Sequence, residues 1–137
     1  DVRCLGIGAY GNLSSFEPVL DTQGDCYARI KVRANEVLQS IDIVNELIDR
    51  IPDGPILNPV KGTPEDGAEA SSILEQPRGE VYYYAAGNGT KYLERMRIRT
   101  PTSQNIAGMT MALKGCEISD VNMIVLTIDP CISCTER

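Results

Sequence analysis

The stretch DPCISCTER, residues 129–137, places two cysteines three positions apart, directly after an Asp-Pro pair. Two thiols at this spacing can bind one soft metal ion through both sulfur atoms. Zinc sites and thiol redox sites share a single Cys-x-x-Cys pair, so the pair alone leaves the metal and the chemistry open. It nevertheless makes Cys131 and Cys134 the first candidate site of this chain.

The remaining cysteines, Cys4, Cys26 and Cys116, are scattered singly, and the sequence has no histidine. The chain therefore lacks the second Cys-x-x-Cys pair of a zinc ribbon, and it cannot complete a mixed cysteine and histidine zinc site by itself. A zinc half-site and a redox disulfide stay open as alternatives for Cys131 and Cys134.

Composition limits the partners of this chain. Its net charge of −6 argues against nucleic acid and against direct docking on anionic lipid. No apolar run approaches the ~20 residues that span a bilayer, so we expect other subunits to hold the protein at any membrane where it works. Five cysteines without a secretory signal favour a reducing compartment, where thiols stay available for metals.

The first half of the chain predicts one long helix between irregular segments. Residues 1–24 are rich in glycine and turn-forming residues, which predicts an irregular segment. Over 25–51 apolar residues recur at steps of three and four, which predicts a long helix with Asp25 as its N-cap and a stop at Pro52. Prolines and glycines in 52–74 predict a loop, with a short helix near 68–74 as an option.

The second half predicts a hairpin and then helices. Two β-prone runs within 80–99 flank Gly-Asn-Gly-Thr, which predicts a β-hairpin. Helices and a metal-binding tail are expected over 103–137, with Thr102 or Ser103 capping a helix over 104–114. The apolar stretch 121–128 fits either a strand or a helix by length. The predicted fold is mainly α with a small β-hairpin element.

Four segments together resemble one protein family. DPCxxCxxR at 129–137 resembles the carboxyl-terminal nickel motif of the nickel–iron hydrogenase large subunit. GDCYAR at 24–29, EQPRGE at 75–80 and IRTP at 98–101 resemble segments of its membrane-bound, energy-converting branch, which is related to the 49-kDa-type subunit of respiratory complex I. The resemblance extends over residues 1–137. Complex I subunits lack the two terminal cysteines, so these cysteines favour the hydrogenase side.

The resemblance implies a fold and a metal centre. It implies the helical bundle portion of a nickel–iron hydrogenase large subunit, with a helix over 121–128. Cys131 would be a terminal nickel ligand, and Cys134 would bridge nickel to an iron carrying cyanide and carbon monoxide. The family uses two further thiolates from an amino-terminal Cys-x-x-Cys, which this chain lacks. We therefore expect a carboxyl-terminal fragment or one half of a split subunit.

The resemblance also gives roles to residues around the cysteines, each with a plainer alternative. Arg78 would lie over the open coordination position, aimed by Pro77, although alone it would pass for a surface arginine. Asp129 would pair with Arg78, or would simply cap a helix or turn. Thr127 would donate to a cyanide, or would be an ordinary threonine in an apolar element. Cys26 would pack at a helix start.

Further family positions have mainly structural expectations. The arginines Arg29, Arg33 and Arg99 are expected to pair with carboxylates at subunit contacts. Arg137 stands where soluble relatives have a histidine that helps to hold magnesium, so a magnesium site is in doubt because arginine cannot ligate a cation.

The resemblance implies partners and a place in the cell. We expect an amino-terminal portion with the other Cys-x-x-Cys, a small subunit with iron–sulfur clusters, membrane ion-translocating subunits and ferredoxin as the electron donor. The location would be peripheral, on the cytoplasmic side of the cell membrane. The activity would be reversible hydrogen production from protons and electrons. Two alternatives stay open, a complex I-like quinone-module or scaffold subunit without nickel and a free-standing zinc or redox domain.

Overall fold

The computed structural model describes residues 1–136, except for the side chain of Ala9, and Arg137 lies outside the described residues. Helices occupy the beginning and the end of the described chain, and strands occupy its middle. The elements in order are η1 (Val2–Leu5), η2 (Gly8–Asn12), α1 (Cys26–Ile48), β1 (Asp66–Gln76), β2 (Gly79–Asn88), β3 (Leu93–Arg99), α2 (Pro101–Leu113), η3 (Ile118–Asp120), α3 (Val121–Ile128) and α4 (Ile132–Glu136).

Helix α1 occupies most of the range 25–51 that apolar spacing predicts. The Asp25 carboxylate accepts a hydrogen bond of 2.7 Å from the Ala28 amide, as expected of an N-cap. The helix ends at Ile48, before the predicted end, and Pro52 disfavours helical backbone at Ile51, so the helix does not resume there. After the helix, backbone amides bond to the carbonyl only three residues back, as from the Ile51 amide to the Ile48 carbonyl.

The sheet is larger than the predicted hairpin. Strands β2 and β3 form that hairpin, with Tyr84 opposite Arg97. A third strand, β1, also pairs antiparallel with β2, with Ser72 opposite Tyr83. The prediction of a loop over 52–74 is therefore wrong for residues 66–74, and so is the option of a short helix near 68–74. Small residues in this segment are compatible with a helix, and pairing with the tyrosine-rich β2 makes it a strand.

The two helices after the sheet lie close to their predicted ranges. Helix α2 begins at Pro101, earlier than predicted, because proline is favoured at the first helical position. Thr102 and Ser103 therefore lie inside its first turn and do not cap it. Residues 121–128 form a helix, α3, which ends when Asp129 takes a left-handed conformation with φ 55° and ψ 57°.

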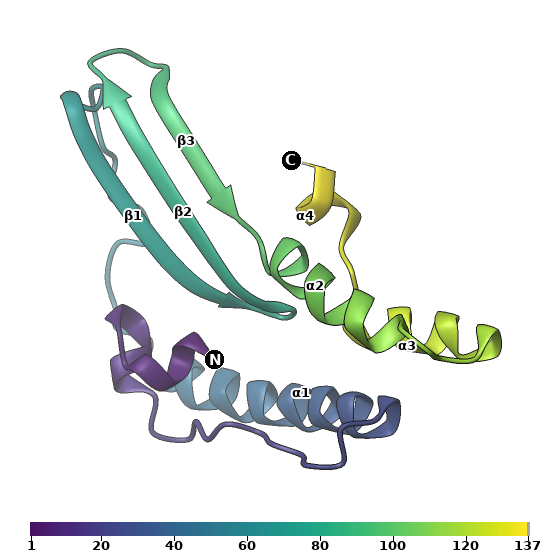
Figure 1. Cartoon of the computed structure of the whole chain (residues 1–137). Coiled ribbons are helices and arrows are strands. Elements are labelled where there is room, and N and C mark those ends of the chain that lie inside the picture. The colour runs from purple at the N-terminus through teal and green to yellow at the C-terminus, as the bar shows by residue number, and fades with distance from the viewer. Residues whose placement is uncertain (137) are drawn as a thin grey trace.

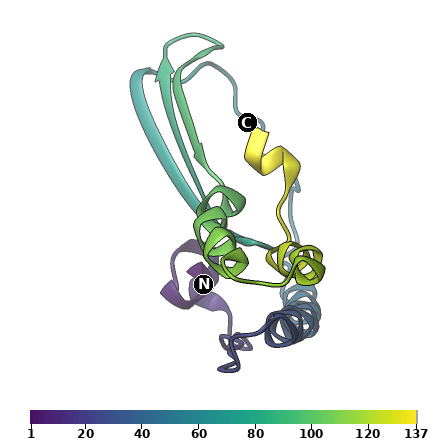
Figure 2. The same ribbon diagram turned by 45° about the vertical axis from the view of Figure 1, so that its right-hand side comes forward.

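The fold is mixed α and β, which corrects the prediction of a mainly α fold. In Figure 1 the three-stranded sheet extends toward the top of the view, away from the helices, and α1 lies at the bottom. Helix α3 contacts both α1 and α2, and the short α4 contacts α2. The turned view in Figure 2 separates α4 from α1. The described helices do not enclose a bundle core, since Val37, Ile41 and Val44 of α1 are each at least half exposed.

An open groove of about 920 Å³ lies between α1 and the turn that joins β1 to β2. Apolar side chains of α1, such as Val32 and Ile41, line this groove together with four arginines. These arginines are Arg3, Arg29, Arg33 and Arg78.

Within residues 1–136, every helix is too short or too polar to cross a membrane.

The segment before α1 is fastened to the helix at Glu46. The Ser14 and Ser15 hydroxyls each donate to the Glu46 carboxylate at 2.6 Å, and Arg50 donates at 2.6 Å as well. The two serines, ahead of Arg50, hold the pKa of Glu46 down at about 2. A carboxylate with a depressed pKa stabilises the fold above its ordinary pKa, and this contribution is lost as the pH falls toward the depressed value.

We therefore expect residues 13–15 to detach from α1 when Glu46 loses its charge. Glu46→Gln should speed amide hydrogen exchange of this segment severalfold at pH 7, and the parent protein should show the same change between pH ~4.5 and about 2. Asp42→Asn, at an exposed position of the same helix, is the matched control and should change nothing. Equal exchange in Glu46→Gln and the parent at pH 7 would contradict this.

Candidate functional site

The two cysteines of the tail lie next to one another. Cys131 directly precedes α4 and Cys134 lies within it, and both are half-buried free thiols. The Thr135 amide and hydroxyl both donate to the Cys131 carbonyl, at 3.2 and 2.9 Å, which closes this turn. The two thiols hydrogen-bond to each other, and the Ser133 hydroxyl lies 3.1 Å from the Cys131 sulfur. The turn therefore presents both sulfurs together, as a shared metal ion requires.

Their surroundings give the two thiols different proton affinities. The Ser133 hydroxyl, followed by the amide and thiol of Cys134, lowers the pKa of Cys131 to about 7. The hydrogen bond with Cys131 and then burial raise the pKa of the Cys134 thiol, while the Thr102 hydroxyl acts in the opposite direction. At neutral pH, Cys131 therefore has thiolate character, which is the form of cysteine that binds a metal.

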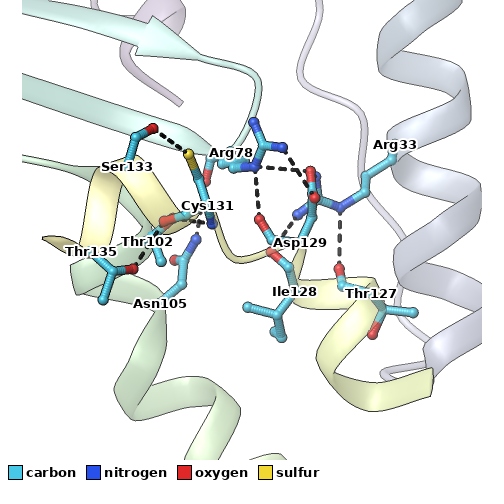
Figure 3. A network of polar contacts seen from close by, with 10 residues as sticks. All are labelled: Arg33, Arg78, Thr102, Asn105, Thr127, Ile128, Asp129, Cys131, Ser133 and Thr135. Atoms are coloured by element: carbon cyan, nitrogen blue, oxygen red, sulfur yellow. Dashed lines mark hydrogen bonds and ion pairs between the residues drawn. The ribbon is translucent and has the colours of Figure 1, made fainter. Parts of the chain in front are cut away.

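Arg78 lies beside this thiol pair and is held by Asp129. Its Nε donates to the Asp129 carbonyl at 2.8 Å, and its Nη2 donates to the Asp129 carboxylate at 3.2 Å (Figure 3). Both side chains are partly exposed, at 33% and 42%. The positive charge of Arg78 also acts on both thiols. The structure thus brings the predicted residues Arg78, Asp129, Cys131 and Cys134 together from positions 51 residues apart along the chain.

Asp129 is the centre of a second arginine contact. Arg33 of α1 lies 3.5 Å from the Asp129 carboxylate and donates to the carbonyls of Thr127 and Ile128 at 3.2 and 3.0 Å (Figure 3). Asp129 is also the only described residue other than glycine with positive φ. Aspartate tolerates this conformation better than most residues. Arg33 and Arg78 bind the carbonyl and carboxylate groups at this end of α3.

The predicted turn residue Pro77 lies at the tip of the hairpin formed by β1 and β2. Gln76 pairs with Gly79, so Pro77 and Arg78 form the whole loop between the two strands. Proline fixes φ at the second position of such a turn, which limits the directions in which Arg78 can leave it. The Asn105 side chain of α2 donates to the Arg78 carbonyl at 3.0 Å and holds the turn from below (Figure 3).

Thr127 lies four residues before Cys131, and its hydroxyl already makes hydrogen bonds within the chain. It is 2% exposed, donates to the Ile124 carbonyl at 2.8 Å and accepts from Arg29 at 3.0 Å. The Cys26 sulfur accepts from the same Arg29 side chain at 3.0 Å, so Cys26 lies at the start of α1 in a polar contact. The predicted contact of Thr127 with a cyanide stays a prediction.

The three arginines that were expected to pair with carboxylates at subunit contacts find partners within this chain. Arg33 pairs with Asp129 and Arg99 pairs with Glu80. Arg29 bonds to a hydroxyl and a thiol. Of these, Arg33 belongs to the candidate site, which sequence reasoning missed because nothing in the sequence links α1 to the turn at 129.

Three residues at the start of α2 also belong to the site without being predicted. Thr102 accepts a hydrogen bond from the Cys131 amide at 3.0 Å, Thr100 donates to the Cys134 carbonyl at 2.7 Å, and Asn105 holds the Arg78 carbonyl. Sequence reasoning considered Thr102 only as a helix cap. The pattern Thr-x-Thr-x-x-Asn at a helix start is its only sequence signal, and it does not say what the side chains face.

The donor set fits half of a four-thiolate nickel site. Two adjacent thiols, one with thiolate character, are the soft donors that such a site needs. Within residues 1–136, no third cysteine, histidine or carboxylate joins them in a group that could hold a metal ion. A complete site therefore needs donors from another segment or another chain. Arg137, on which the doubt about magnesium rests, lies outside the described residues.

Comparisons with known proteins show which family this chain belongs to. The family described as "Respiratory-chain NADH dehydrogenase, 49 Kd subunit" matches residues 6–66 and 59–137. The carbon monoxide-induced hydrogenase of Rhodospirillum rubrum is 41% identical over the full chain, which covers 38% of that protein. The membrane-bound hydrogenase subunit alpha of Pyrococcus furiosus is 34% identical over 84% of this chain and 29% of that subunit.

A solved structure is similar as well. One chain of the membrane-bound sulfane sulfur reductase, an archaeal respiratory membrane complex, superposes with a TM-score of 0.79 and 29% sequence identity. The match covers 94% of this chain and 36% of that one. The chain thus spans roughly a third of the length of the relatives that it matches. It belongs to the family of the 49-kDa subunit of respiratory-chain NADH dehydrogenase, and it resembles the large subunits of membrane-bound hydrogenases.

Proposed function

We propose that this chain is the nickel-binding carboxyl-terminal part of the large subunit of an energy-converting nickel–iron hydrogenase. The observation that supports this best is the contact between Arg78 and Asp129, two residues before Cys131. A charged arginine fixed beside two soft thiols suits redox chemistry of a small substrate better than it suits a structural zinc site, which needs no such neighbour.

In this proposal Cys131 and Cys134 would hold the nickel of a nickel–iron centre whose iron carries cyanide and carbon monoxide, and Cys134 would be shared between the two metals. When bound, the nickel–iron pair supplies the place where dihydrogen is split and formed. Two further thiolates come from an amino-terminal Cys-x-x-Cys of the same subunit or of a partner chain. Thr127 is the proposed donor to a cyanide, in exchange for its bond to the Ile124 carbonyl. Pro77 sets the position of Arg78.

The contribution of this chain to the reaction is positioning and polarisation. Asp129 binds Arg78 through both its carbonyl and its carboxylate, so the guanidinium keeps one orientation next to the thiols. A fixed positive charge at this place stabilises negative charge that develops nearby. Because a guanidinium keeps its proton under almost all conditions, we assign Arg78 this role ahead of that of a base.

The partners follow from the incomplete donor set and from the relatives. We propose a small subunit with an iron–sulfur cluster near the nickel, membrane subunits that translocate ions, and ferredoxin as the electron donor. The names of the relatives, which include a membrane-bound hydrogenase and a respiratory membrane complex, support an assembly of this kind. The proposed place is the cytoplasmic side of the membrane.

The nickel content of the purified complex tests the proposal. About one nickel per large subunit, together with hydrogen oxidation, is expected. A second candidate is a complex I-like quinone-module or scaffold subunit, which the description of the matching family favours. A complex without nickel that still transfers electrons to a quinone would support this second candidate and contradict the first.

The 137-residue chain alone should neither retain nickel nor turn over hydrogen. It supplies two thiols, and large apolar side chains of α1 stay exposed without further chain to cover them. Nickel analysis and hydrogen uptake of the purified chain, compared with the assembled complex, check this expectation. Tight nickel binding by the chain alone would mean that the site needs no other segment.

A further inference from the structure

The first turn of α2 makes direct contact with both cysteines of the tail. The Thr102 hydroxyl accepts a hydrogen bond from the Cys131 amide at 3.0 Å (Figure 3). It also interacts with the Cys134 thiol. Two residues earlier, the Thr100 hydroxyl donates to the Cys134 carbonyl at 2.7 Å. Two buried threonines, separated by Pro101, therefore hold the beginning and the end of the Cys-x-x-Cys segment.

The same turn holds the arginine of the site. The Asn105 side chain donates to the Arg78 carbonyl at 3.0 Å, across 27 residues of sequence (Figure 3). Asn105 and Thr102 lie one helical turn apart on α2, so their side chains leave the same face of the helix. One short piece of helix thus contacts the backbone at Arg78 and at Cys131, which belong to two separate elements.

The burial of these hydroxyls indicates that their hydrogen bonds matter. Thr102 is 2% exposed and Thr100 is 5% exposed. A buried hydroxyl costs free energy unless it is hydrogen-bonded, and valine would fill nearly the same space without that cost. Thr110 of the same helix offers a contrast, because it is exposed and its hydroxyl donates to the Ala107 carbonyl of its own helix.

We infer that the first turn of α2 is the positioning element of the site, in which Thr102 keeps Cys131 and Cys134 in the arrangement that binds one metal ion, and Asn105 keeps Arg78 beside them. Neither residue donates to the metal in this inference. It rests on the proposed function for the identity of the metal, and on the hydrogen bonds alone for the arrangement of the thiols.

Two conservative substitutions of Thr102 separate its hydroxyl from its volume. Thr102→Val keeps the shape and removes the hydroxyl, whereas Thr102→Ser keeps the hydroxyl and removes a methyl group. Thr110→Val is the matched control on the same helix. All three are made in the complete complex, and thermal unfolding of each establishes that the variant is folded.

Phenylarsine oxide reports the arrangement of the thiols without nickel. In the metal-free complex it forms two arsenic–sulfur bonds across neighbouring thiols, and its oxygen leaves as water with both thiol protons. Peptide mass spectrometry locates the bridge at Cys131 and Cys134. We expect Thr102→Val to slow this bridging about tenfold and to lower bound nickel in step, as the loss of a buried hydrogen bond predicts. Thr102→Ser should stay within about twofold of the parent in both readouts.

The outcomes distinguish this inference from the proposed function. Bridging and nickel at parent levels in Thr102→Val would overturn the role of Thr102, and so would an equal loss in Thr102→Ser. A parent complex without nickel in which Thr102→Val still slows bridging would contradict the proposed function and support the positioning role.

A third variant tests the contact with the arginine. Asn105→Leu removes the donor to the Arg78 carbonyl and leaves the contacts of the thiols untouched. We expect normal bridging by phenylarsine oxide and normal nickel, with hydrogen oxidation reduced about tenfold. Unchanged turnover in this variant would remove Asn105 from the positioning element.

Discussion

Complexes with Cys131→Ser or Cys134→Ser are expected to contain no nickel and to show no hydrogen turnover. Serine is almost the same size as cysteine, but its oxygen is a harder donor that does not ionise near neutral pH. The two sulfurs lie together on one turn, and the pKa of Cys131 is about 7. Each cysteine therefore supplies a soft sulfur donor that serine cannot replace. Nickel per complex and hydrogen oxidation, measured on the same preparations, check this.

Two other cysteines serve as controls for that experiment. Cys4 is exposed and Cys116 is half-buried, and neither joins a group of described residues that could hold a metal ion. Cys4→Ser and Cys116→Ser should therefore keep nickel and activity. If all four serine variants lost nickel equally, the cysteines would act through folding, and the two-thiol site would be wrong.

The fold was predictable where local chemistry decides it. Asp25 and Pro52 mark the ends of the region that becomes α1, and the turn at 89–92, which overlaps the predicted Gly-Asn-Gly-Thr segment, separates β2 from β3. Strand β1 was missed because its sequence has little β-preference of its own, and its structure depends on a partner strand. The predicted bundle is not closed because α1 leaves much of its apolar surface uncovered in this part of the protein.

The site was predictable where a motif marks it and unpredictable where tertiary contacts make it. The sequence motifs pointed to Arg78, Asp129, Cys131 and Cys134, and the structure brings these four together. Arg33 and Thr102 have no motif that links them to the tail. Only the packing of α1 and α2 against residues 127–134 brings their side chains to it.

Arg78→Lys should leave nickel in place and lower hydrogen oxidation by about 100-fold. Lysine keeps the positive charge, but it lacks the planar group that bonds the Asp129 carbonyl and carboxylate at the same time. Its ammonium would take several positions, and misplacing a group by about an ångström can cost ~100-fold in rate. The measurement is turnover at fixed nickel content, and Arg97→Lys on the exposed part of β3 is the control.

Asp129→Asn should act in the same direction and more weakly. Asparagine tolerates the left-handed conformation of residue 129, so the backbone carbonyl stays available to Arg78 Nε. The side-chain oxygen still accepts a hydrogen bond, but the negative charge of the acceptor is lost, which costs ~1.4 kcal/mol and about tenfold in rate.

Full activity in Arg78→Lys would reduce Arg78 to a surface residue. Loss of nickel in step with activity would make the contact between Arg78 and Asp129 structural, since positioning alone leaves the metal bound.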